Sequence, residues 1–126
     1  QIGKVIYVGE TNDDSPTLIY LDYLATPEFT IPTNSVYSVS LDVIARDNAS
    51  GDISNWIANA VIKNVSGTTS FVGTPSITQF ASDGSMVTTD IDLIANNTTN
   101  SLDIEVTGLA GADIRWVASV HYTAII

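Results

Sequence analysis

The chain has no cysteine and very few positive charges. Without cysteine it can form neither a disulfide nor a thiolate metal site, so its stability has to come from packing or from association between copies. Only 4 Lys and Arg accompany 14 Asp and Glu, which gives a net charge of −10. Nucleic acids and anionic membrane surfaces are bound through cationic side chains, so we expect neither as a partner. No apolar segment approaches the roughly 20 residues of a membrane-spanning helix.

Charged residues of either sign are also scarce. They make up 14% of the chain, whereas hydrophobic residues reach 44%. A small monomer of this composition would expose much apolar surface, so we expect identical copies to cover part of it. The length of 126 residues fits one domain. We expect residues 1–126 to form a single β-sandwich, with residues 1–35 as an N-terminal arm or as extra strands. Because the chain begins with Gln1 rather than Met, we expect a fragment or a processed product.

Runs of Val, Ile, Thr and Tyr alternate with clusters of Asn, Asp, Gly and Ser along the whole sequence. This texture predicts strands at Ile2–Val8, Thr17–Leu24, Val36–Arg46, Trp56–Val65, Ser70–Val72, Ser76–Ala81, Met86–Ala95, Leu102–Thr107 and Ile114–Thr123. Strands at this spacing indicate an all-β fold, and we expect an antiparallel β-sandwich of jelly-roll or Greek-key type. The segment Thr26–Pro32 holds two prolines, and Thr26–Ser35 is expected to be the long connection that crosses between the sheets.

One segment fits two periodicities. Ile53, Trp56, Ile57, Ala60 and Val61 follow helical spacing, but alternate residues from position 56 to 62 are also apolar. The segment lacks Glu, Gln and Leu, which are strong helix formers. We therefore favour a strand.

Two predicted strands carry bulky apolar residues on both faces. They are Val36–Ala45 and Ile114–Tyr122, and such strands need a second cover, either another sheet or another subunit. The tryptophans lie in strongly apolar strands and are interpreted as core or interface residues rather than as sugar platforms. The residues predicted to form a subunit interface are Trp56, Trp116, Val120 and Tyr122.

Residues for catalysis are few. His121 is the single histidine, and it lies in the apolar C-terminal strand. No nucleophile elbow, zinc-protease motif or phosphate-binding glycine loop is present in the sequence. We therefore expect a protein that is not an enzyme.

Four carboxylates are predicted to crowd one face of a hairpin. Matching the apolar faces of Met86–Ala95 and Leu102–Thr107 places Asp92 near Asp103 and Asp90 near Glu105. If the C-terminal strand pairs next in line, Arg115 lies beside Glu105 or Thr107 and can offset part of the charge. The cluster is interpreted as a solvated acidic face, and a hard cation such as Ca²⁺ is the alternative. No other cofactor is expected.

Several short motifs in residues 36–123 resemble a known family. They are Val43-Ile44-Ala45-Arg46, Gly67-Thr68-Thr69, Val72-Gly73-Thr74, a Leu-x-Ile-x-Val-Thr-Gly run at residues 102–108, and Ile114-Arg115-Trp116-Val117-Ala118. This pattern resembles a β-rich C-terminal domain of fibre and other virion-surface proteins of tailed phages. The final residues 121–126 are more apolar than the family's pattern.

The resemblance implies a β-sandwich at the end of a fibre or spike, usually trimeric, and implies no catalytic residue. We expect a module on the virion surface that contacts other virion proteins, as a fibre or spike tip or as a capsid decoration. Three hypotheses remain open. The first is an assembly module that forms a homotrimer. The second is a tip that binds a host receptor or a cell-surface glycan, and the third is a hydrolase fragment of a tailspike.

Overall fold

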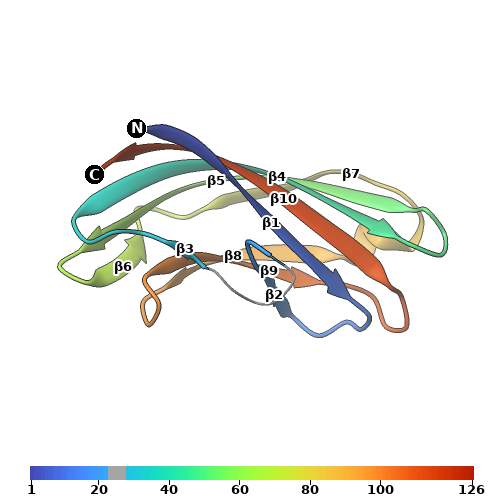
Figure 1. The fold of residues 1–126 in the computed structure, drawn as a ribbon. Coiled ribbons are helices and arrows are strands. Elements are labelled where there is room, and N and C mark those ends of the chain that lie inside the picture. Colours follow the sequence, from blue (N-terminus) through green and yellow to red (C-terminus); the bar gives the residue numbers. More distant parts are fainter. Residues whose placement is uncertain (23–27) are drawn as a thin grey trace.

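The computed structural model describes residues 1–22 and 28–126. In these residues the chain forms two antiparallel β-sheets packed face to face, as Figure 1 shows, so the predicted antiparallel β-sandwich is confirmed. The upper sheet in this view has six strands in the order β1-β10-β4-β5-β6, and β7 also pairs with β5. These strands are β1 (Ile2–Thr11), β4 (Ser35–Asp47), β5 (Ile53–Val65), β6 (Thr68–Phe71), β7 (Ser76–Ser82) and β10 (Ile114–Ile125).

The lower sheet has four strands around β9. They are β2 (Thr17–Ile19), β3 (Phe29–Thr30), β8 (Asp90–Asn96) and β9 (Ser101–Thr107). Both β2 and β3 pair with one edge of β9, and β8 pairs with its other edge. All ten residues of β1 pair with β10, so the first 35 residues supply strands to both sheets.

The predicted strands differ from the observed ones mainly in two places. The predicted strand Thr17–Leu24 pairs only to Ile19, followed by an isolated bridge from Tyr20 to Val8. Its last two residues lie outside the described residues. The predicted strand Met86–Ala95 begins as a 3₁₀ helix, η1 (Gly84–Thr88). The Met86 side chain is fully buried there, and the Met86 carbonyl oxygen accepts a 2.7 Å hydrogen bond from the Thr89 hydroxyl, which closes the turn.

The predicted crossing segment Thr26–Ser35 is described only from residue 28 onward. Residues 31–34 lead from β3 in the lower sheet to β4 in the upper sheet, so this part does cross between the layers. The short strand β3 within the segment was not predicted, because a two-residue strand leaves no periodicity to detect.

The segment with two periodicities is a strand. β5 pairs with β4 along Ile53–Asn64, and its even-numbered residues are buried while most odd-numbered ones are exposed. The choice of strand over helix is therefore confirmed. At the end of β5, Ser66 and Gly67 have φ angles of 52° and 88°, the left-handed conformations that a two-residue hairpin to β6 requires.

Polar side chains cross the core and join the two sheets. The Tyr7 hydroxyl on β1 donates a hydrogen bond to the carbonyl oxygen of Leu102 on β9. The Asn64 side-chain amide on β5 donates to the Ile31 carbonyl at 2.8 Å, and both groups are buried. Such bonds add directional contacts to the apolar packing, so each strand has a fixed place over the opposite sheet.

Candidate functional site

Three of the four residues predicted to form a subunit interface lie in the core of a single copy. Trp116 and Val120 are completely buried, and Trp56 is 9% exposed. The Trp116 indole N–H donates a 3.0 Å hydrogen bond to the Thr11 hydroxyl, and both atoms are buried. These residues point inward, and the four-stranded sheet covers them. The prediction that they contact another subunit is therefore wrong.

Tyr122, the fourth predicted interface residue, is half-buried within an aromatic cluster of the same copy. Its ring centroid lies 5.5 Å from that of Phe29 and 5.1 Å from that of Tyr37. A Cβ atom at Gly3, its cross-strand partner, would lie 2.2 Å from the Tyr122 hydroxyl oxygen, so glycine leaves the space that the ring occupies. Because Tyr122 keeps part of its surface exposed, its place in a subunit interface stays a prediction.

The acidic hairpin exists, but its register differs from the predicted one by two residues. Asp92 lies opposite Glu105, and Asp90 lies opposite Thr107 rather than Glu105. The reason lies in the turn, where the Asn96 side-chain oxygen accepts hydrogen bonds from the backbone N–H groups of the two threonines that follow, at 2.9 and 3.1 Å. Asn96 thereby stays in the ladder opposite Ser101, and every earlier pair moves with it.

Asp103 is separated from the other carboxylates and has polar partners of its own. It is 7% exposed and accepts hydrogen bonds from the Asn96 amide and the Ser101 hydroxyl, both at 2.8 Å. Burial, and after it the charge of Asp103, raise the pKa of Tyr7 well above the ordinary tyrosine value. Within residues 1–22 and 28–126, no three His, Asp or Glu side chains lie where they could share a metal ion.

Arg115 does not lie beside Glu105. Its strand, β10, pairs with β1 and β4 in the other sheet, and the Arg115 Nε lies 3.7 Å from Glu10 Oε1. The expected pairing with the hairpin carboxylates is therefore wrong, because β9 and β10 belong to different layers. His121, on the same outward side of β10, is exposed and lies opposite Lys4.

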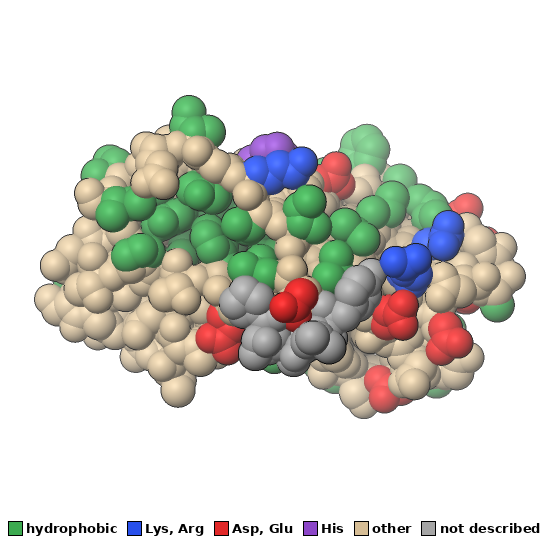
Figure 2. All heavy atoms as spheres, viewed as in Figure 1, with side chains coloured by type: hydrophobic (Ala, Val, Ile, Leu, Met, Phe, Trp, Pro, Cys, Tyr) green, Lys and Arg blue, Asp and Glu red, His purple; other side chains and the backbone are tan. Residues whose placement is uncertain are grey.

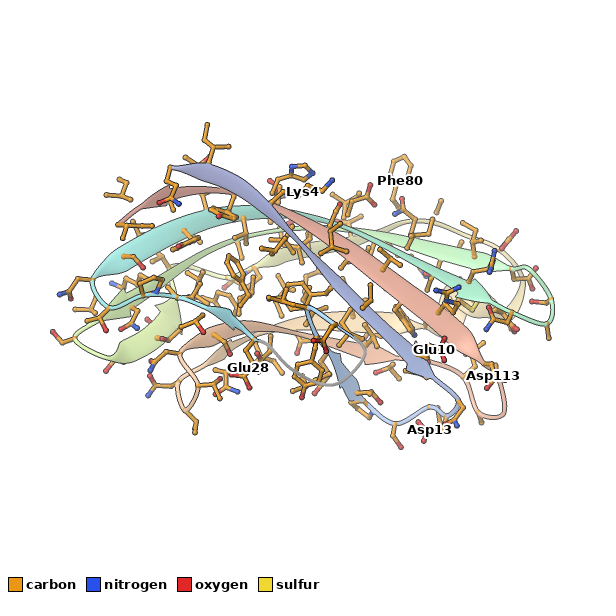
Figure 3. All side chains as sticks on the ribbon, viewed as in Figure 1. Lys4, Glu10, Asp13, Glu28, Phe80 and Asp113 are labelled. Carbon is orange, nitrogen blue, oxygen red and sulfur yellow. The ribbon has the colours of Figure 1, made fainter. Side chains whose placement is uncertain are left out.

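Alternate residues of the six-stranded sheet point to solvent and carry an apolar patch. The patch consists of Ile44, Ile57, Phe80 and Val117, which are 47%, 37%, 74% and 37% exposed. Ile44 and Val117 lie directly opposite each other on β4 and β10. A hollow of about 360 Å³ separates them from Phe80, which projects away from the sheet in Figure 3.

The same outer face holds every Lys and Arg of the chain. Lys4, Arg46, Lys63 and Arg115 occupy outward positions of β1, β4, β5 and β10 and are all exposed. In Figure 2 the blue side chains lie along the upper sheet, whereas most of the visible red ones lie below them. The patch and the cations therefore share one surface.

Sequence analysis missed the patch, although its signal is present. The β10 segment was interpreted as apolar on both faces. Its outward residues up to position 123 are in fact polar except for one aliphatic residue, Val117: Arg115, Val117, Ser119, His121 and Thr123. If Trp116 is assigned to the core, its neighbour Val117 must point to the outer face of the strand. Phe80 has no such signal, because the bulge between Asn55 and Trp56 of the paired strand β5 shifts its register.

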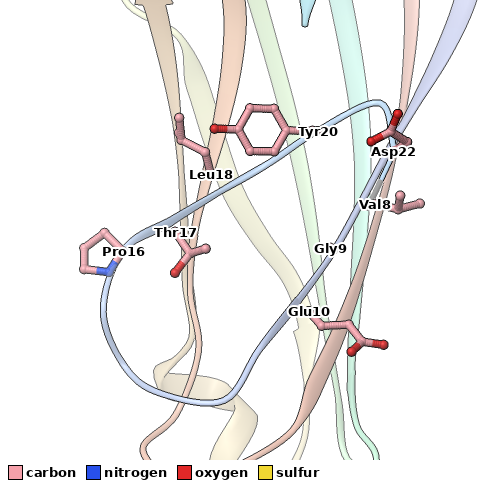
Figure 4. Close-up of a pocket in the computed structure, with 8 residues that line it drawn as sticks. All are labelled: Val8, Gly9, Glu10, Pro16, Thr17, Leu18, Tyr20 and Asp22. Carbon is pink, nitrogen blue, oxygen red and sulfur yellow. The ribbon is translucent and has the colours of Figure 1, made fainter. Parts of the chain in front are cut away.

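A second concave feature lies between β1 and β2. This groove has a volume of about 640 Å³, and its lining residues include Tyr20, Glu10 and Asp22. Figure 4 shows Tyr20 and Thr17 on the β2 side and Glu10 on β1. Gly9 in its wall is required for packing, since a Cβ atom there would lie 2.4 Å from the Ile19 Cγ2. Sequence analysis did not find the groove, because β1 and β2 form it together.

Comparison with known proteins identifies no family. No family model and no curated protein matches the chain. Among solved structures, the tailspike protein gp49 of Acinetobacter baumannii bacteriophage Fri1, described as a capsular polysaccharide depolymerase, is 10% identical with a TM-score of 0.46. The tailspike protein of Acinetobacter phage vB_ApiP_P1 is 16% identical with a TM-score of 0.34.

The chain is covered over 95% and 97% of its length in these two alignments, but it spans only 17% and 21% of the two tailspikes. At these TM-scores the likeness assigns neither a family nor an activity. The described part of the chain also contains no helix of the length and hydrophobicity needed to cross a membrane.

Proposed function

We propose that this chain is a non-enzymatic structural module of the surface of a tailed-phage particle and that it acts by assembling with copies of itself. The observation that carries the proposal is the apolar patch on the outer face of the six-stranded sheet. The motif resemblance of residues 36–123 supports the phage setting. A fibre, a spike and a capsid decoration all fit this proposal.

The patch has the composition of an interface core. Ile44, Val117 and Phe80 line one hollow together with the polar Asp42 and Asn55, and Ile57 lies two residues beyond Asn55 on β5. Isolated exposed aliphatic residues, by contrast, are common on any protein surface. Arg46, Arg115 and Lys4 lie on the same face outside the patch, which gives the arrangement of apolar centre and polar rim found in subunit contacts. Covering the patch removes apolar area from water and stabilises the assembly.

Ile44→Asp tests the proposal because it places a charge in the centre of the patch. We expect the unmodified chain to associate at tens of micromolar in sedimentation velocity and the variant to weaken that association by about tenfold or more. Val65→Asp is the matched control, since Val65 is 51% exposed at the end of β5, outside the patch. If the unmodified chain and Ile44→Asp associate equally, the patch is not part of the contact between copies.

The groove between β1 and β2 supports a second candidate function, recognition of a host-surface glycan. An aromatic ring can stack on the apolar face of a sugar, and carboxylates accept hydrogen bonds from its hydroxyl groups. Tyr20 and Asp22 supply a ring and a carboxylate in this groove, whereas the Glu10 carboxylate lies toward Arg115. In this reading the domain binds the glycan and does not cleave it.

Binding to a glycan array separates this candidate from assembly. We expect Tyr20→Ala to abolish any binding and Phe80→Ala, which removes an exposed aromatic ring outside the groove, to retain it. Binding that survives Tyr20→Ala would exclude the groove as the site. Release of reducing sugar ends from a bound polysaccharide would contradict the non-enzymatic assignment.

A further inference from the structure

We infer that copies of this chain associate head to tail, with the outer face of the six-stranded sheet of one copy seated on the outer face of the four-stranded sheet of the next. The inference rests on the proposed self-assembly and specifies its geometry. It is carried by the separation of charge between the two outer faces, which sequence composition does not reveal.

The outer face of the six-stranded sheet is the cationic one. It holds all 4 Lys and Arg of the chain, at positions 4, 46, 63 and 115, in a protein with 14 Asp and Glu. The only acidic residues among its outward strand positions are Glu10 and Asp42. This face therefore has a net positive charge, although the whole chain has a net charge of −10.

The outer face of the four-stranded sheet is the acidic one. Asp90 and Asp92 are exposed on β8, and Glu105 is half-buried on β9 opposite Asp92. Asp103 adds a fourth carboxylate on the same side of β9. No Lys or Arg lies on this sheet, since all of them are on the other one.

Apolar side chains accompany the carboxylates on the acidic face. Leu18 lies opposite Glu105, and Ile94 lies opposite Asp103, and both apolar side chains are half-buried. These residues give the apolar patch of a neighbouring copy a surface to contact between the charged groups. The two faces are thus complementary in charge and both carry apolar side chains, the combination that favours a specific contact.

A symmetric contact between two identical faces is disfavoured. Two six-stranded faces would bring Lys4, Arg46, Lys63 and Arg115 of both copies together, and two four-stranded faces would bring the carboxylates of both copies together. The cationic and acidic faces lie on opposite sides of the sandwich, as the arrangement of the layers in Figure 1 shows. A contact between unlike faces is heterologous, and it closes into a ring or continues as a filament, depending on the rotation between neighbours.

Charge reversal on each face tests the inference in the full chain. The cation-reversed variant changes Lys4, Arg46 and Lys63 to Glu, and the acid-reversed variant changes Asp90, Asp92 and Glu105 to Lys. We expect each to weaken self-association by about tenfold or more, because each leaves two faces of like charge. The variant with all six substitutions exchanges the charges of the two faces, keeps the net charge of −10, and is expected to regain association.

The acid-reversed variant also separates facial complementarity from net charge. It makes the protein less negative, so association governed by net repulsion would become stronger, whereas the head-to-tail contact requires that it become weaker. Thermal unfolding of every variant shows whether the fold is retained, which we expect because all six side chains point outward.

The outcomes distinguish the inference from the function on which it rests. An unmodified chain that stays monomeric would overturn the proposed assembly itself. An unmodified chain that associates, together with an acid-reversed variant that associates equally well, would overturn only the head-to-tail geometry. Failure of the folded six-substitution variant to associate would also overturn that geometry, since its two faces are again opposite in charge.

Discussion

The two sides of strand β10 differ in composition and have opposite places in the structure. Its inward residues include Trp116 and Val120, which are completely buried under the four-stranded sheet. Its outward residues include Val117, which is 37% exposed in the apolar patch, and Arg115. The comparison teaches that residue parity, rather than the size of a side chain, separates what holds one copy together from what is available to join copies.

The largest expected loss of stability comes from a substitution on the inward side of β10. Trp116→Ala removes a fully buried indole and its hydrogen bond to Thr11, and we expect it to lower the free energy of unfolding by about 3–5 kcal/mol. The adjacent outward change Val117→Ala is the matched control and is expected to cost about 0.5 kcal/mol or less in the monomer. Urea unfolding at low protein concentration measures both. Equal losses would mean that the two sides of β10 are buried alike.

A smaller effect concerns the contact between the two layers. Tyr7→Phe removes the hydroxyl that donates to the Leu102 carbonyl, and we expect a loss of about 1–2 kcal/mol at neutral pH. Tyr20→Phe is the control, because Tyr20 lies at the groove outside this contact. Equal stability of Tyr7→Phe and the unmodified chain would show that the bond between the layers contributes nothing.

The same tyrosine predicts a dependence on alkaline pH. Its pKa is raised in the folded chain above the ordinary value of 10.0, first by burial and then by Asp103, so the folded state holds the proton more tightly than the unfolded state. This contribution is fully present below about pH 10 and is lost as the pH rises above that value. Urea unfolding across this range should show a smaller loss of stability with pH for Tyr7→Phe than for Tyr20→Phe.

The positions of the strands could be predicted from the sequence more readily than the strands and residues with which they pair. The alternation of Asp and apolar residues in β8 and β9 correctly identified a hairpin with its acidic side outward. Its register could not be predicted, because the Asn96 side chain extends the ladder to Ser101 by bonding the turn. A shift of two residues keeps every side chain on its face, so the apolar pattern did not distinguish the two registers.

Sheet membership was the other feature that the pattern could not supply. Alternation shows that Arg115 points away from the Trp116 side, but it does not show that β1 and β4, rather than β9, are the partners of β10. The predicted site residues failed for this reason. Three of the four expected interface residues lie in the core, and the actual outer surface, with Ile44 and Phe80, depends on strand order that only the structure shows.

The claim that copies of this chain cover one another is tested most directly by sedimentation velocity of the unmodified protein over a concentration series up to about 100 μM. The account predicts that species heavier than the 13.4 kDa chain grow with concentration. A single 13.4 kDa species at every concentration would contradict it.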